Sequence, residues 1–176
     1  MAITYLKHAK PDADKAQDDA QTRAVVETTL ADIEARGDQA VRDLAQKFDQ
    51  YTPLSFRLSE EQIHKIIAKV PARDMEDIKF AQQQVRNFAQ VQRDSMLDVE
   101  VETLPGVILG HKHIPVQSVG CYVPAGKFPM VASAHMSVAT ASVAGVPRII
   151  ACTPPFNGEP NPAVVAAMHL GGAHEI

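Results

Sequence analysis

The chain has 176 residues, 45% of them hydrophobic and 22% charged, which suits one large or two small globular domains. A formal net charge of −4 argues against a nucleic-acid-binding surface, and no apolar stretch is long enough for a transmembrane helix. Two cysteines, Cys121 and Cys152, exclude a disulfide framework, and residues 1–7 lack the pattern of a secretory signal. We therefore expect a cytoplasmic protein with neither nucleic acid nor membrane as a partner.

Charge and turn-forming residues divide the chain near residue 98. Residues 1–98 carry 17 acidic and 14 basic side chains, whereas residues 99–176 carry 4 and 3. Eight of the nine glycines and nine of the twelve prolines lie after residue 104. This pattern predicts a helix-rich N-terminal segment over residues 1–98 and a buried, turn-rich α/β region over residues 99–176.

The first segment predicts a succession of amphipathic helices. Residues 12–36 contain neither Pro nor Gly, and Gly37 is typical of a helix end. Asp38 is expected to cap a second helix, on which apolar residues recur at helical spacing up to Phe48. The default interpretation of Phe48 is therefore core packing.

Two further helices are expected before residue 96. Ser59 and Gln62 form a capping-box pattern ahead of an apolar stretch, and Pro71 suits the first turn of the following helix. The buried face of that last helix is predicted to carry Met75, Ile78, Val85 and Phe88.

The second segment changes to the patterns of strands and turns. Residues 99–102 alternate apolar and polar side chains, as a half-buried strand does. Residues 119–123 and 148–153 read as buried strands, and residues 131–144 and 162–170 as helices. Strand, helix and strand in this order predict a βαβ unit with a parallel, Rossmann-like sheet, so the fold class is α/β with an N-terminal helical segment. We expect the α/β domain to be incomplete at its C-terminal end.

The turn at residues 122–126 is the best local candidate for a ligand site. Parallel sheets bind ligands at the carboxyl ends of their strands, and Tyr122 lies at such an end. Gly126 allows close approach of backbone to a ligand, and Lys127 adds a cation. The residues match neither the dinucleotide fingerprint nor the P-loop, and an ordinary turn is the alternative interpretation.

Other reactive side chains carry weaker signals. His111 and His113 would face one side of a strand and could share a metal ion, but without a Cys or carboxylate cluster an exposed polar edge is favoured. His135 is more typical of a core or interface group than of a base. Cys121 and Cys152 are expected to be buried small hydrophobes. These residues alone identify no reaction.

Several stretches resemble the histidinol dehydrogenase family. They include Ala-Arg-Gly-Asp-Gln-Ala-Val (residues 35–41) with Lys-Phe-Asp (47–49), and Val-Glu-Thr-Leu-Pro-Gly-Val (101–107). The most specific is Pro-Val-Gln-Ser-Val-Gly-Cys-Tyr-Val-Pro-Ala-Gly (115–126), which leads through Met136 to Ala-Gly-Val (144–146) and Thr-Pro-Pro (153–155). Order and spacing match over essentially the whole chain.

The resemblance implies an oxidoreductase that oxidises an amino alcohol, L-histidinol or a related small polar alcohol, through an aldehyde to the acid in two NAD-dependent steps. It implies NAD and zinc as cofactors, a Glu-His pair for acid/base chemistry, a role in histidine biosynthesis and an intertwined homodimer. The zinc ligands and the catalytic residues are expected beyond residue 176, because family members are more than twice as long. The alternative is a non-catalytic fragment that folds, dimerises or binds nucleotide weakly.

The resemblance transfers few site residues. Tyr122 matches an NAD-contacting Tyr, Pro124 belongs to the same turn, and Phe48 matches an aromatic near the cofactor. The chain departs from the family pattern at Ala125, around Ser133 and at His135, all close to the turn. These departures suggest a paralogue with another alcohol substrate, for which Lys127, Ser133 and His135 are substrate-side candidates; Lys127 and His135 could favour an anionic substrate, as in relatives that oxidise sulfonated diols.

Overall fold

The computed structural model describes residues 12–176, so the prediction about a secretory signal in residues 1–7 lies outside the described residues. The chain divides into two compact units, one ending at Thr52 and the other spanning Pro53–Ile176. Each unit is described by itself. Within the described residues, no helix is long and apolar enough to cross a membrane.

The first unit is a pair of helices joined by a single glycine. Helix α1 spans Asp12–Arg36 and α2 spans Asp38–Asp49. Gly37 has a φ of 57°, a conformation that glycine adopts without steric cost, and this permits the abrupt change of direction. Asp38 is the first residue of α2 and Gly37 holds the cap position, so the expected Asp38 cap is wrong by one residue.

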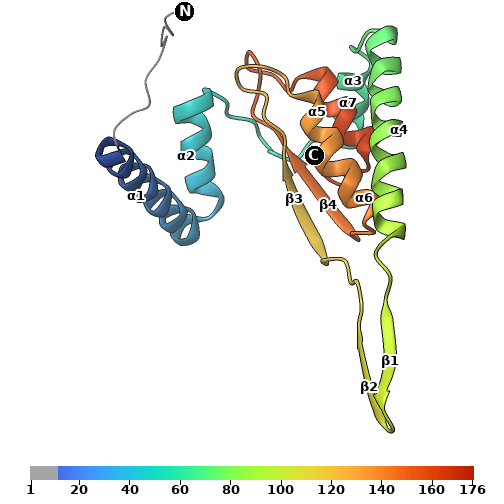
Figure 1. Cartoon of the computed structure of the whole chain (residues 1–176). Helices are drawn as coiled ribbons and strands as arrows, with labels where there is room; N and C mark the ends of the chain where they lie inside the picture. The colour runs from blue at the N-terminus through green and yellow to red at the C-terminus, as the bar shows by residue number, and fades with distance from the viewer. Residues whose placement is uncertain (1–11) are drawn as a thin grey trace, which may run out of the picture. The chain divides into compact units, whose positions relative to one another are not determined.

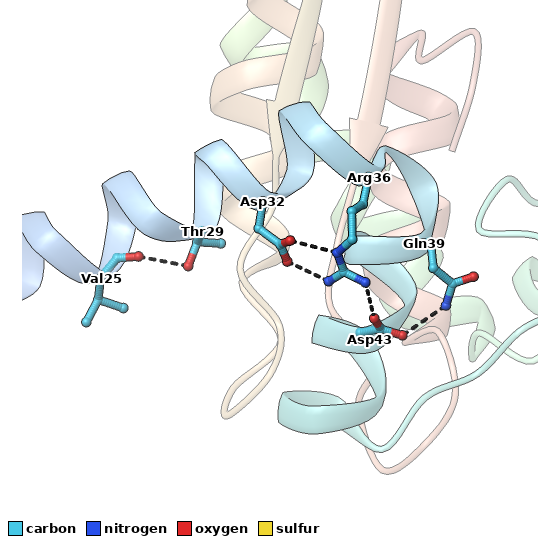
Figure 2. Close-up of polar contacts among 6 residues, drawn as sticks. All are labelled: Val25, Thr29, Asp32, Arg36, Gln39 and Asp43. Carbon is cyan, nitrogen blue, oxygen red and sulfur yellow. Dashed lines mark hydrogen bonds and ion pairs between the residues drawn. The ribbon is translucent and has the colours of Figure 1, made fainter.

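Arg36 ties the two helices of the first unit together, as Figure 2 shows. Its guanidinium donates two hydrogen bonds to Asp32 on α1, at 2.7 and 2.6 Å, and one to Asp43 on α2, at 2.7 Å. Gln39 donates to the other carboxylate oxygen of Asp43 at 2.9 Å. These hydrogen bonds from Arg36 lower the pKa of both carboxyl groups, which favours the charged network at neutral pH.

Two helices open the second unit. Helix α3 spans Glu60–Ile67, and the predicted capping box between Ser59 and Gln62 is confirmed in both directions. Helix α4 spans Ala72–Asp94 and begins directly after Pro71. Ile78, Gln82 and Ala89 form its buried stripe, whereas Phe88 is 65% exposed, so the prediction for Phe88 is wrong. Phe88 precedes Ala89 by one residue and is therefore rotated about 100° away from that stripe.

The predicted βαβ unit is confirmed. Strands β3 (Ser118–Tyr122) and β4 (Arg148–Cys152) are parallel and paired from Ser118↔Arg148 to Tyr122↔Cys152. The crossover consists of three helical segments in succession, α5 (Val131–Ala134), the π-helical η1 (His135–Ala139) and α6 (Thr140–Val143). Helix α7 spans Pro162–Gly171, and Figure 1 shows it among α3, α4 and the crossover helices.

The last residues lie beside β4 in parallel. The His174 amide donates to the Ile149 carbonyl at 2.8 Å, and the Ala151 amide donates to the Glu175 carbonyl at 2.9 Å. The Glu175 carboxylate accepts from Arg148 at 2.8 Å and pairs with Arg57 at 3.1 Å. The third extended segment of this sheet is thus held by backbone bonds and by two cations.

The core of the second unit lies between the sheet and its helices. Its largest fully buried side chains are those of Ile149, Met168, Val123, Val138, Val164 and Val165. Ile63 of α3 and Ile78 of α4 belong to the same core. The change in composition near residue 98 therefore falls inside the second compact unit, because α3 and α4 share a core with the α/β elements.

A two-stranded antiparallel hairpin extends from the second unit (Figure 1). It consists of β1 (Val99–Leu104) and β2 (Val107–His111). The expected half-buried strand is wrong in its burial, because every residue of both strands is exposed. The alternation itself is present: directly paired residues share a face, so one face carries the aliphatic set Val99, Val101, Leu104, Val107 and Leu109. No element of the second unit covers this face, and the residues remain 43–66% exposed.

Candidate functional site

The carboxyl ends of β3 and β4 bring two loops together. Tyr122 and Cys152 are the last residues of the two strands and are directly paired. The loop after β3 closes on itself through a 3.0 Å hydrogen bond from the Met130 amide to the Pro124 carbonyl. It runs beside the loop after β4, since a Cβ added to Gly126 would lie 3.7 Å from Cγ of Pro154. The two loops form the edge at which parallel sheets bind ligands.

At the carboxyl end of β3 and in the loop after it, successive side chains alternate between the two faces of the sheet. Cys121, Val123 and Ala125 are buried, at 4%, 0% and 0% exposure, and point toward the helices. Tyr122 and Pro124 are exposed and therefore point to the opposite side. The Tyr122 side chain is 62% exposed on that side. The structure thus places the two predicted cofactor residues of this turn together on the open face of the sheet.

The two cysteines differ in environment. Cys121 is buried, as predicted, and burial raises the pKa of its thiol, which suits a packing role. The prediction that Cys152 is buried is wrong. Because Cys152 is paired with Tyr122 in parallel register, both side chains lie on the open face. The Pro-Pro pair after residue 152 marks the strand end, but only the register reveals the thiol beside Tyr122.

The three substrate-side candidates do not share one environment. Lys127 is exposed in the loop, with Nζ 6.0 Å from the centre of the Phe128 ring. Ser133 is half-buried in the first turn of the crossover helix, where its amide donates to the Met130 carbonyl at 2.9 Å. His135 is 5% exposed and lies on the face of the crossover helix that also carries the buried Val138 and Ala139.

His135 is held in its neutral form by its surroundings. Burial lowers the pKa of its imidazole, and Nδ1 has no hydrogen-bond partner among the described residues. It is the first residue of η1, and π-helical turns within longer helices occur often at functional sites. Its helix lies on the covered side of the sheet, because its neighbours Ala134 and Val138 belong to the same core as the inward-pointing Cys121. His135 and Tyr122 are therefore on opposite sides of the sheet.

Phe48 belongs to the first unit. Its ring is 69% exposed on α2, and the Nζ of Lys47 lies 5.1 Å from the ring centre. The default interpretation of core packing is wrong within this unit, since Phe48 lies near the exposed end of the apolar stripe of α2. An exposed aromatic ring is available for a ligand or a partner surface.

Potential metal ligands are scattered. Among residues 12–176, no three His, Cys, Asp or Glu side chains gather closely enough to hold a metal ion. His111 and His113 lie at the end of the hairpin with ring centres 5.2 Å apart. A carboxylate is nearby after all, because the His113 amide donates to Asp98 at 2.9 Å. Asp98 precedes β1 and comes close to His113 only when the hairpin forms, so sequence spacing did not reveal it.

Comparison with known proteins identifies the family. A sequence model described as histidinol dehydrogenase matches residues 12–176, nearly the whole chain. The chain belongs to the histidinol dehydrogenase family. A histidinol dehydrogenase homolog of Shouchella clausii is 53% identical over 172 residues, which are 98% of this chain and 41% of that protein. A sulfopropanediol 3-dehydrogenase of Ruegeria pomeroyi is 48% identical over 177 residues, covering all of this chain and 40% of that protein.

A solved histidinol dehydrogenase has the same fold. The crystal structure of the enzyme from Elizabethkingia anophelis superposes with a TM-score of 0.79 at 26% identity, over 96% of this chain and 36% of that one. The predicted α/β fold class and the family resemblance are confirmed. The chain spans about two fifths of the length of the relatives it matches. The roles of Tyr122, Pro124 and Phe48 in cofactor binding stay predictions.

Proposed function

We propose that the chain is the nucleotide-side part of an NAD-dependent alcohol dehydrogenase of the histidinol dehydrogenase family. One observation carries the proposal: Tyr122 and Pro124 lie together, exposed, on the open face at the carboxyl end of the parallel strands. Family membership supports the reaction class. The substrate would be L-histidinol or a related small polar alcohol, oxidised through an aldehyde to the acid by a homodimeric enzyme.

The chain's own residues account for binding and positioning. When bound, NAD supplies the hydride acceptor for the alcohol carbon. The Tyr122 ring offers an apolar face for stacking and a hydroxyl for hydrogen bonding, while Pro124 stiffens the turn beside it. Buried Val123 and Ala125 anchor the same turn to the core, so the exposed ring is presented from a fixed backbone.

The family's zinc ion does not fit the described residues. Zinc needs about three or four nitrogen, sulfur or oxygen ligands in one place, and residues 12–176 gather no such group. We therefore derive no catalytic step through a metal from these residues. The catalytic acid and base are likewise proposed to lie outside this chain.

The substrate is proposed to be an anionic small alcohol. The 48% identity to a relative named sulfopropanediol 3-dehydrogenase supports this, against 34–36% to relatives named histidinol dehydrogenase. Lys127 supplies an exposed cation beside the turn. His135 contributes no charge, because burial keeps its imidazole neutral at pH 7. In a full-length enzyme that carries this chain, we expect Lys127→Ala to raise KM for a sulfonated diol more than for a neutral diol. His135→Leu should leave this ratio unchanged. Equal KM changes for both alcohols would contradict the role of Lys127.

A non-catalytic role is the second candidate. The uncovered aliphatic face of the hairpin and the absence of a metal-ligand group in residues 12–176 favour it for this chain taken alone. NADH formation from histidinol or a panel of small diols, measured with zinc present on a full-length enzyme of the family that carries this chain, separates the two candidates. Turnover supports the dehydrogenase, nucleotide binding without turnover supports the non-catalytic role, and absence of both in the folded chain contradicts the nucleotide-side assignment.

A further inference from the structure

The open face of the sheet carries little side-chain bulk next to Tyr122. Side chains on one face of a strand recur every second residue, so the neighbour of Tyr122 along β3 is Gly120. Its neighbour across the sheet is Cys152, with which it is directly paired. Gly120 is in turn paired with Ile150, which is half-buried. The exposed ring of Tyr122 therefore stands beside a glycine and a small thiol.

The fold of the described residues does not require a glycine at position 120. Gly120 lies inside β3 and is not among the glycines with a positive φ. A Cβ added to it would meet no atom of the described residues within 4 Å beyond its chain neighbours. Gly110 differs, because a Cβ there would clash with the paired strand. A glycine inside a strand weakens the strand and often marks the close approach of a ligand or of another backbone.

The gap that Gly120 leaves in the row of side chains fits a planar ring stacked on Tyr122. Residues two apart in a strand are separated by about 6.6 Å, so the residues that flank the gap, Ser118 and Tyr122, lie about 13 Å apart. Two offset-stacked aromatic rings have centroids about 4.5–7 Å apart. A ring stacked on this side of Tyr122 would therefore lie over Gly120, with the aliphatic Ile150 beside it on β4.

A ligand accounts for this gap better than the backbone of another protein segment does. The gap lies next to the carboxyl end of β3, where parallel sheets bind ligands, and it adjoins the exposed ring of Tyr122. An aromatic wall and an aliphatic wall suit a nitrogen heterocycle, whose faces are apolar and whose edges form hydrogen bonds.

We propose that Gly120 admits one planar ring of the nucleotide cofactor to the space beside Tyr122, so that the size of residue 120 determines how tightly the cofactor binds. The ring stacks on Tyr122, lies over the backbone of Gly120 and contacts Ile150 at its edge. NAD contains two rings of the required class, adenine and nicotinamide. This inference rests on the proposed function, because it places part of the cofactor at the site that Tyr122 and Pro124 define.

The test is calorimetric titration with NAD of a full-length enzyme of the family that carries this chain, as wild type and as single variants at positions 120 and 118. Gly120→Ala and Gly120→Val fill the gap with one and three carbon atoms. We expect Kd to rise a few-fold for Gly120→Ala and at least about tenfold for Gly120→Val. Ser118→Val places the same branched side chain on the same face, farther from Tyr122, and should change Kd by less than about twofold.

Thermal unfolding of the same proteins separates a loss of binding from a loss of folding. Both variants at position 120 should fold, because the Cβ position is open and β-branched residues are favoured in strands. Unchanged NAD affinity in Gly120→Val would overturn the proposal, and a lower melting temperature in that variant would then assign the gap to another protein segment. If Gly120→Val does not fold, the smaller Gly120→Ala decides, and an unchanged Kd in that variant would overturn the proposal.

Tyr122→Ala distinguishes a failure of this inference from a failure of the proposed function. NAD binding that weakens in Tyr122→Ala but not in Gly120→Val would overturn the inference and leave the nucleotide site standing. A wild-type enzyme that does not bind NAD would overturn both.

Two fragments of NAD identify the ring that lies over Gly120. ADP-ribose carries the adenine ring, and nicotinamide mononucleotide carries the nicotinamide ring. We expect Gly120→Val to weaken the binding of one fragment at least about tenfold and that of the other by less than about twofold. An equal loss for both fragments would show that the substitution disturbs the whole face, and would contradict a site for a single ring.

Discussion

Side chains of α4 complete the C-terminal ends of two neighbouring helices. Arg86 donates to the Leu170 and Gly171 carbonyls at 3.1 and 2.6 Å, and Gln82 donates to the Ala167 carbonyl at 2.6 Å. Arg93 donates to the Val143 carbonyl at 2.6 Å, at the end of α6. The last carbonyls of a helix lack partners within it and carry partial negative charge, so a cation there is stabilising. These polar residues lie along the otherwise apolar buried face of α4, and their role is structural rather than catalytic.

Replacing Arg86 should destabilise the second unit. Arg86→Ala removes a charged donor from two half-buried carbonyls, which is expected to lower the free energy of unfolding by about 2–3 kcal/mol. Arg73→Ala, on the exposed side of the same helix, is the control and should change it by less than about 0.5 kcal/mol. Urea denaturation measures both, and equal effects of the two variants would contradict the capping role.

Glu175 should give the stability of the second unit an acid-sensitive component. The hydrogen bond from Arg148, aided by the charge of Arg57, lowers the pKa of its carboxyl below the ordinary value of 4.5. A lowered folded-state pKa means that the stabilisation is full above about 4.5 and is lost as the pH falls through the lowered value. Glu175→Gln should therefore be less stable than the wild type at neutral pH, with a difference that shrinks in acid.

Chemical denaturation at a series of pH values checks this dependence. Glu61→Gln serves as the comparison, because Glu61 pairs with Lys65 at an exposed position of α3, where ion pairs contribute little. A difference between Glu175→Gln and the wild type that stays constant down to strongly acid pH would show that the Glu175 carboxylate does not titrate with folding.

At the level of elements, local patterns predicted the helices and strands but not their surroundings. The capping box at Ser59 and the apolar stretches of β3 and β4 depend on neighbouring residues, so they could be recognised in the sequence. The alternation in β1 likewise predicted a strand with one apolar face. Whether that face is covered depends on elements distant in the chain, and the exposure of Phe88 depends on where α7 meets α4. Such tertiary contacts leave no local signal.

The hairpin requires a residue without a side chain at position 110. A Cβ added to Gly110 would clash with the Val99 carbonyl oxygen on the paired strand, so the backbone would have to move. Gly110→Ala should disrupt the pairing of β1 with β2 at a cost of about 1–3 kcal/mol to the hairpin. Gly120→Ala in β3 is the control, because its added Cβ meets nothing within 4 Å.

Amide hydrogen exchange distinguishes these two glycine variants. We expect faster exchange in residues 99–111 of Gly110→Ala, with the amides of β3 and β4 unchanged, and near-wild-type exchange in Gly120→Ala. Protected hairpin amides in Gly110→Ala would show that the strands tolerate the added methyl group.

At the scale of the molecule, the family and the parallel sheet could be predicted from the sequence. The face of the sheet on which each candidate side chain lies could not. Tyr122 and Pro124 could be placed at a strand end from the motif alone. That His135 lies on the opposite, covered side could not, because the sequence shows a short distance along the chain and not the side of the sheet. The uncovered hairpin face likewise became visible only in three dimensions.

The hairpin face should behave as an exposed apolar surface. Val101 and Leu109 are directly paired on it, so Val101→Glu with Leu109→Lys places opposite charges side by side and preserves the pairing. This double variant should bind a hydrophobic dye such as ANS more weakly than the wild type, with little change in thermal stability. Ile108→Thr, on the other face, is the control; an equal loss of dye fluorescence there would contradict a one-sided apolar face.

The most direct test of the nucleotide-side assignment is a titration of the folded chain with NAD. Calorimetry of the wild type and of Tyr122→Ala should show binding that weakens about tenfold or more when the exposed ring is removed, since stacking contributes about 1–3 kcal/mol. Phe80→Ala removes a similarly exposed ring from α4 and should leave the affinity unchanged. NAD binding that is equally strong in Tyr122→Ala, or lost equally in Phe80→Ala, would contradict a cofactor site at the carboxyl end of β3.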